Sequence, residues 1–297
     1  MLNNNAKGVA YAVGYMLLTC VSLMFVESIS VKEQIDPLIM LWVNAIVATI
    51  IMHIILLSKL KLTYIKFIKY PLSTTFMMVT VLLIVASSFY SIKKIGTMEY
   101  LVLYFSVMGF VSSLVEILLH KNKLNTLRLM VFAIVCIMLV NYLMQKNDIA
   151  VVITFIGASA GVLYARFSQK LALNVNMSAL QILSIRYWLV ILIIPLLFND
   201  CLESVINGVH VLKEKFVIIT LLSIITLILP LYMTQKSLKH ISYSKNGIIN
   251  SCAPLIAILG NYIFTNNLID SIFIVAATCI FLNTLLTKHI NSHKMSS

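Results

Sequence analysis

Residues 91–108 read SIKKIGTMEYLVLYFSVM, and residues 237–254 read SLKHISYSKNGIINSCAP. Each stretch follows a long apolar segment, begins with a serine, an apolar residue and two Lys or His side chains, and continues into a further apolar segment. The second stretch begins 146 residues after the first, in a chain of 297 residues. Self-similarity at an offset of about half the chain predicts an internal repeat.

Ten long apolar segments fill nearly the whole chain. The apolar segments before and after the two stretches quoted above are among them. Hydrophobic residues make up 61% and charged residues 11%, whereas an average soluble domain has about 25% charged residues. A helix needs roughly 20 apolar residues to cross the hydrocarbon core of a bilayer. The sequence therefore predicts an all-α polytopic membrane protein with ten transmembrane helices. The predicted spans are Gly8–Val26, Pro37–Ser58, Pro71–Ile92, Met98–Leu119, Leu129–Gln145, Ile149–Gln169, Met177–Phe198, Phe216–Gln235, Asn246–Phe264 and Leu268–Thr287.

The basic residues between these spans predict the orientation in the membrane. With the N-terminus in the cytoplasm, 14 lysines and arginines fall on the cytoplasmic side and 6 on the outer side. Lys and Arg are retained on the cytoplasmic side, so we expect both termini there. The net charge of +12 then reflects a cytoplasmic face against anionic lipid rather than a nucleic-acid partner. The Ile-, Asn- and Lys-rich composition hints at an AT-rich bacterial genome, and we expect the bacterial cytoplasmic (inner) membrane.

The repeat divides the chain into residues 1–146 and residues 147–297, with five spans in each half. Spans two and seven align at an offset of 142, which places Asn44 against Arg186. Because five is odd, the second half must enter the membrane from the opposite side, which makes this an inverted repeat. In secondary transporters such repeats rock about a site near the midplane and give alternating access.

With this layout the chain resembles the drug/metabolite transporter superfamily, specifically its EamA-type ten-helix transporters, over essentially its whole length. A family pattern of a basic turn followed by a proline matches Ser237 to Pro254, while Met108 occupies the proline position in the first half. The family's arginine in the second helix of each repeat matches Arg186 and is replaced by Asn44. Because the family's glycine–glutamate pair after the fourth helix is missing, the chain is identified as a divergent member.

The resemblance implies a secondary transporter of a small amphipathic metabolite. It favours export of amino acids or their derivatives by alternating access, driven by protons or by a counter-substrate. The alternative is an importer or exchanger of S-adenosylmethionine or of a nucleotide-like metabolite. A non-transporting membrane scaffold is the alternative of another class.

Two arginines lie within the predicted spans. A charge at the bilayer centre costs at least about 2.5–3.5 kcal/mol, so it normally faces protein or a water-filled cavity. Arg166 in span six and Arg186 in span seven are at similar depth, and together they can clamp a carboxylate or phosphate. The alternative is that one or both arginines reach the headgroups or hold helix ends.

Further candidate substrate ligands are one acid and several aromatic or amide residues. Glu99 begins span four and can bind an ammonium group or carry a proton, unless it is an ordinary interfacial carboxylate. Aromatic side chains suit apolar or cationic groups of a substrate, although Trp and Tyr also anchor helices at the membrane interface. Pro254 frees a backbone carbonyl near Asn250, and such breaks often border transport sites. The other candidates are Tyr90, Tyr104, Tyr164, Trp42, Trp188 and Asn44.

Other classes find little support in the sequence. We see no Ser/His/Asp set, zinc-ligand spacing or phosphate-cradling glycine loop, and expect neither an enzyme nor a cofactor or metal. Of the five cysteines only Cys201 lies in an outer loop, which excludes a disulfide framework. The small residues of 157–161 let helices approach closely, and we expect them to pack within one chain that is a monomer or a homodimer. The expected partners are a small-molecule substrate and membrane lipids, and no nucleic acid.

Overall fold

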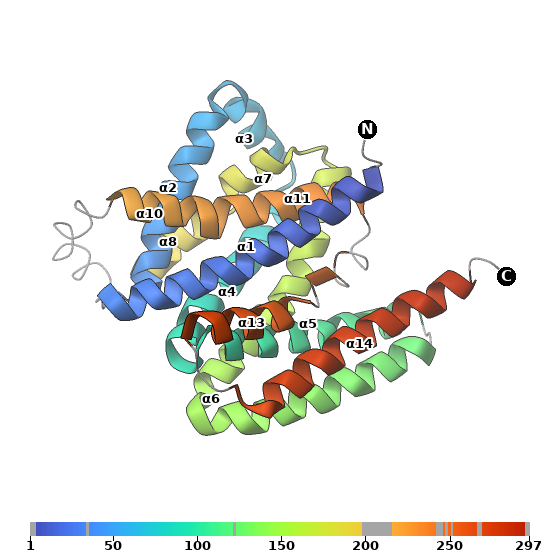
Figure 1. Cartoon of the computed structure of the whole chain (residues 1–297). Helices are drawn as coiled ribbons and strands as arrows, with labels where there is room; N and C mark the ends of the chain where they lie inside the picture. The colour runs from blue at the N-terminus through green and yellow to red at the C-terminus, as the bar shows by residue number, and fades with distance from the viewer. Residues whose placement is uncertain are drawn as a thin grey trace.

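The computed structural model describes residues 4–33, 36–120, 123–197, 216–241, 246, 249–250, 252–265 and 269–294. All regular structure in these ranges is helical (Figure 1). The helices are α1 (Asn4–Glu33), α2 (Pro37–Ile55), the short η1 (Leu57–Lys59), α3 (Leu60–Lys69), α4 (Pro71–Ile95), α5 (Thr97–His120), α6 (Lys123–Leu173), α7 (Ala179–Ile185), α8 (Trp188–Leu197), α10 (Phe216–Leu222), the π-helical η2 (Ser223–Ile228), α11 (Leu229–His240), α13 (Ala253–Thr265) and α14 (Ser271–Lys294).

Within the described ranges, seven helical segments are long and apolar enough to cross a membrane. Two shorter apolar segments, Ala253–Ile263 and Ser271–Asn283, follow them. Many of the exposed side chains on these helices are large and apolar, as lipid-facing surfaces require. The architecture is that of a polytopic helical membrane protein, and the prediction of this fold class is confirmed at that level.

Helix α6 has 51 residues, and a straight helix of that length would be about 75 Å long. Its backbone leaves the helical region at Asn147, with φ −165° and ψ 105°, and Figure 1 shows the helix changing direction there. The Asn147 Oδ1 atom accepts a hydrogen bond from the Ala150 amide at 2.8 Å, as a cap at the start of a new helix does. The predicted spans Leu129–Gln145 and Ile149–Gln169 lie on either side of this break.

The segment from 179 to 197 is also interrupted, because Arg186 and Tyr187 form a turn between α7 and α8. Pro195 lies inside α8, and a proline there cannot donate a hydrogen bond to the carbonyl four residues earlier, that of Ile191. The indole nitrogen of Trp42 donates to this carbonyl at 3.0 Å. The contact replaces the missing helical bond and joins α2 to α8.

Small residues allow the closest helix contacts. A Cβ atom on Gly157 of α6 would lie 1.8 Å from the Oγ atom of Ser87 on α4, and one on Gly109 of α5 would lie 2.2 Å from the Phe132 ring on α6. A Cβ on Gly161 would lie 2.5 Å from the hydroxyl of Tyr104. The expectation that the small residues of 157–161 pack within one chain is confirmed for both of its glycines.

Two apolar clusters form the core. The first joins α1, the end of α4, α5, both halves of α6, α13 and α14, and the second joins α1, α2, α4, the second half of α6, α7, α8, α10 and η2. Tyr90 of α4 packs against both clusters.

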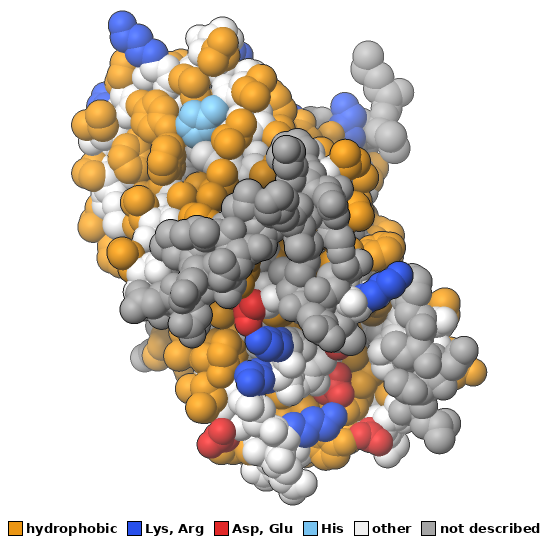
Figure 2. Space-filling view, turned by 90° about the vertical axis from the view of Figure 1, so that its left-hand side faces the viewer, with side chains coloured by type: hydrophobic (Ala, Val, Ile, Leu, Met, Phe, Trp, Pro, Cys, Tyr) orange, Lys and Arg blue, Asp and Glu red, His pale blue; other side chains and the backbone are white. Residues whose placement is uncertain are grey.

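Acidic side chains, together with several basic ones, gather in the lower part of the face shown in Figure 2, while other basic side chains lie at its top. The ion pair between Lys93 and Asp36, at 2.5 Å, joins the end of α4 to the start of α2. The Tyr142 hydroxyl donates to Asp270, which joins α6 to the residues just before α14. Asp36 and Lys93 lie between predicted spans, and Asp270 lies near the start of the last one. The predicted topology places all three on or near the same side of the membrane.

The connection between the second and third predicted spans is helical rather than a simple loop. It contains η1 and α3, and α3 packs on the body of the protein through the buried side chain of Thr63. The hydroxyl of Thr63 accepts a hydrogen bond from the Gln181 amide of α7 at 3.1 Å.

Candidate functional site

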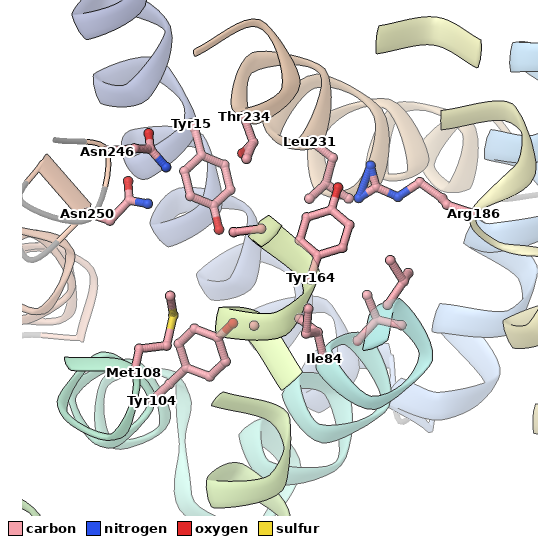
Figure 3. Close-up of a pocket in the computed structure, with 14 residues that line it drawn as sticks. Tyr15, Ile84, Tyr104, Met108, Tyr164, Arg186, Leu231, Thr234, Asn246 and Asn250 are labelled. Atoms are coloured by element: carbon pink, nitrogen blue, oxygen red, sulfur yellow. The ribbon is translucent and has the colours of Figure 1, made fainter. Parts of the chain in front are cut away.

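A cavity of about 60 Å³ lies among α1, α4, α5, α6 and α11 (Figure 3). Its apolar lining includes Val81, Ile84 and Leu231. Its polar lining comes from elements far apart in the sequence and consists of Tyr15, Tyr104, Tyr164, Arg186, Thr234, Asn246 and Asn250.

Arg186 supplies the only charged side chain among the lining residues. The turn between α7 and α8 places it inside the bundle, where its side chain is 1% exposed. Its guanidinium carbon lies 5.3 Å from the ring centroid of Tyr164 and 5.1 Å from that of Tyr187. Its Nε and Nη1 atoms have no hydrogen-bond partner among the described residues.

The two tyrosine rings offset part of the cost of burying this cation. Each cation–π contact is worth about 0.5–2 kcal/mol, whereas a buried charge without a counter-ion costs several kcal/mol. Unused donors of a buried guanidinium are the groups that an entering carboxylate or phosphate satisfies. The site therefore favours an anion.

Tyr164 is held in place by α11. The amide nitrogen of Gln235 donates to the Tyr164 hydroxyl at 2.8 Å and also to the hydroxyl of Ser168. Because its oxygen already accepts a hydrogen bond, the Tyr164 hydroxyl can donate its proton to a ligand in the cavity.

Amide groups line the side of the cavity opposite Arg186. Figure 3 shows Asn246 and Asn250 at one end, Arg186 at the other, and the rings of Tyr15 and Tyr164 between them. Asn246 Oδ1 accepts a hydrogen bond from Ser237 at 3.0 Å. Asn250 Oδ1 is buried without a partner among the described residues. The cavity thus presents hydrogen-bond donors at one end and a free acceptor at the other.

Four of the residues predicted from the sequence meet in this cavity. They are Tyr104, Tyr164, Arg186 and Asn250.

The structure does not bring the two arginines of the predicted clamp together in the cavity. Arg166 is exposed, and only Arg186 lines the cavity. The reason is helical geometry, since Arg166 lies two residues after Tyr164 and hence about 200° around α6. Two charges at equal depth on consecutive helices need not share a face.

Glu99 does not line the cavity. Its carboxylate accepts a hydrogen bond from Lys146 at 2.9 Å and is 16% exposed. Of the two interpretations given for this residue, the interfacial carboxylate agrees with its position.

The remaining candidates do not line the cavity either. Trp42 bonds the Ile191 carbonyl, and Asn44 accepts a hydrogen bond from Ser223 of η2 at 3.0 Å. Trp188 is 37% exposed and packs edge-on against His53. Tyr90 is half-buried between the two core clusters. Each of these side chains therefore has a packing or hydrogen-bonding role.

Three polar lining residues were not predicted: Tyr15, Thr234 and Asn246. A signal existed for Asn246, because it lies four residues before Asn250 and such a pair shares one face of a helix. Tyr15 and Thr234 carry no charge and lie in ordinary apolar segments, so the sequence gives no comparable signal.

The comparisons with protein-family models and with curated proteins find no match to this chain. Among the described residues, no three His, Cys, Asp or Glu side chains lie close enough together to hold a metal ion.

Proposed function

We propose that this protein is a secondary transporter for a small amphipathic metabolite that carries a carboxylate, with amino acids or their derivatives favoured. The observation that carries the proposal is the buried Arg186, which lines a cavity inside a bundle of apolar helices and whose Nε and Nη1 atoms have no partner in the part of the chain that the structure describes. An ionisable group within membrane-spanning helices is a functional-site candidate. An anion bound there would offset the cost of its burial.

The opposite end of the cavity supports a zwitterionic substrate. Asn250 Oδ1 can accept a hydrogen bond from an ammonium group, while Arg186 binds the carboxylate of the same molecule. The rings of Tyr15, Tyr104 and Tyr164 leave room for apolar substrate atoms between the two ends.

The small volume of the cavity agrees with a transporter whose central binding site is contracted. About 60 Å³ equals roughly two water molecules at about 30 Å³ each, and ligand sites usually measure about 300–1,000 Å³. Binding of an amino acid requires the cavity to widen. Alternating access provides such widening, because the helix groups on its two sides move apart.

The arrangement of the helices supports the proposal of ten spans in two inverted repeats, and with it a divergent member of the drug/metabolite transporter superfamily. The break at Asn147 lies at the start of the proposed second repeat. The first helix of each proposed half packs along the third of the other: α1 contacts α11 at Gly14, and the second half of α6 contacts α4 at Gly157.

A second candidate substrate is S-adenosylmethionine or a nucleotide-like metabolite. The three tyrosines of the cavity favour it, because aromatic rings bind sulfonium groups and nucleobases through cation–π and stacking contacts. Such a molecule demands a much larger opening than a single amino acid does.

The test is uptake and counterflow in proteoliposomes with a pool of labelled amino acids and S-adenosylmethionine. Wild type is compared with Arg186→Met, and Arg166→Met is the matched control because its side chain lies outside the cavity. We expect wild type and the control to transport one member of the pool and Arg186→Met to lose that flux. Flux that survives Arg186→Met unchanged would contradict an anion site at this residue, and absence of flux for every compound would favour a scaffold.

A further inference from the structure

Helix α3 exposes an unusual mixture of side chains. On its outward side the apolar Leu62, Ile65 and Ile68 alternate around the helix with Lys61 and Lys69. Ile68 is 72% exposed. A short helix with exposed Leu and Ile beside lysines is typical of a segment that lies in the plane of the membrane interface.

The surroundings of α3 have the same character. The sequence contains no Asp or Glu between Asp36 and Glu99, so the lysines of α3 have no nearby acid in sequence. The exposed apolar surface continues into the end of α2, into η1 and into the start of α4, where Ile54, Leu57 and Leu72 are largely exposed. The apolar face of α3 is therefore continuous with the surface that the spanning helices present to lipid.

The inward side of α3 is fixed to the rest of the protein. Thr63 is fully buried and bonded to Gln181 of α7. The Lys66 ammonium donates to the carbonyl of Asn176, between α6 and α7, at 2.7 Å. Tyr64 shares a hydrogen bond of 2.7 Å with His53 of α2. Three contacts thus connect α3 to α2, to α7 and to the segment that precedes α7.

We propose that α3 is a binding site for anionic phospholipids at the membrane surface. Leu62, Ile65 and Ile68 enter the boundary between headgroups and acyl chains, and the ammonium groups of Lys61 and Lys69 reach the lipid phosphates. Lysine stems are long enough to follow an apolar surface while the charge stays in the headgroup layer. Because α3 is attached to α2 and to the α6–α7 connection, a bound lipid stabilises the folded arrangement of these helices.

The experiment measures lipid contact at α3 in the full chain and needs no knowledge of a transported substrate. Tyr70→Trp places a reporter at the end of α3. Trp42→Phe and Trp188→Phe remove the two native tryptophans, so that the fluorescence comes from the reporter alone. The protein is reconstituted into equal mixtures of phosphatidylcholine and phosphatidylglycerol, of which one or the other is brominated. Bromine quenches the reporter only when that lipid lies next to it, so the two mixtures give the relative affinity of α3 for the two lipids.

We expect phosphatidylglycerol to be preferred at least about fivefold, the factor that corresponds to about 1 kcal/mol for one lysine near an anionic surface. Lys61→Gln with Lys69→Gln should abolish the preference. The matched control, Lys32→Gln with Lys94→Gln, removes two exposed lysines elsewhere and should retain it. Equal quenching by both lipids in the parent protein, an equal loss in both double variants, or no quenching at all would overturn the proposal.

The thermal unfolding midpoint provides a second readout. A ligand that binds only the folded state raises the midpoint, so the midpoint should be higher in vesicles with phosphatidylglycerol than in phosphatidylcholine alone. Lys61→Gln with Lys69→Gln should remove this difference. A difference that persists in this variant would place the lipid effect elsewhere in the protein and contradict the attachment argument.

Discussion

Replacement of Arg186 by methionine should weaken substrate binding and strengthen the fold at the same time. Methionine retains most of the length of the side chain without its charge. The insertion cost of a buried arginine, at least about 2.5–3.5 kcal/mol, disappears. The contacts with the rings of Tyr164 and Tyr187 disappear as well, at about 0.5–2 kcal/mol each. At about 1 kcal/mol for each contact, the balance is a gain of about 1 kcal/mol in the free energy of unfolding.

Substrate binding changes in the other direction. Two guanidinium atoms, Nε and Nη1, donate to none of the described residues, and a hydrogen bond to a charged group contributes about 1.5–3 kcal/mol. With the lower value for each, the loss of both hydrogen bonds costs about 3 kcal/mol of binding free energy. This corresponds to roughly a 150-fold rise in Kd. Scintillation proximity binding and thermal unfolding in detergent measure the two effects on the same preparation. A less stable variant with unchanged affinity would refute the reasoning and would assign Arg186 a structural role.

Two further predictions concern packing and hydrogen bonding, both measured by thermal unfolding. Gly157→Ala should destabilise the protein by about 1–3 kcal/mol, as overpacking does, because its new methyl group overlaps Ser87. Ser87→Gly should restore much of the loss, and a persistent loss would argue against this contact. Trp42→Phe should cost about 1–3 kcal/mol by leaving the Ile191 carbonyl unpaired. In a Pro195→Ala background the cost should fall, because the alanine amide can bond that carbonyl. Equal costs in both backgrounds would contradict the assigned role of Trp42.

Sequence reasoning located the helices better than the site. All ten predicted apolar segments contain helix in the described residues, because a chain inside lipid must satisfy its backbone hydrogen bonds internally. Hydropathy does not report local breaks, so the turn at Arg186 and the π-helical η2 were not predicted. Helix α3 was not predicted either, because lysines interrupt its short apolar pattern.

The residues of the cavity depend on which face each helix turns inward. Arg186 and Arg166 look alike in the sequence, yet one is buried against tyrosines and the other is exposed. Uniformly apolar helices have little periodic contrast between their faces, so the sequence offers few cues to their rotation. Trp42 illustrates the same limit, because its partner carbonyl on Ile191 is set by Pro195, more than a hundred positions away in the chain.

The exchange of helices between the two halves of the chain has a mechanical consequence. The first apolar cluster contains parts of both halves, and so does the second. In the proposed transport cycle, the packed clusters would move as solid bodies, because close-packed side chains do not deform continuously. The moving parts would therefore be two bundles of mixed sequence origin rather than residues 1–146 against residues 147–297. Helices α1, α4 and α6 contribute side chains to both clusters, so these three helices would be the covalent connections about which the two bundles rotate.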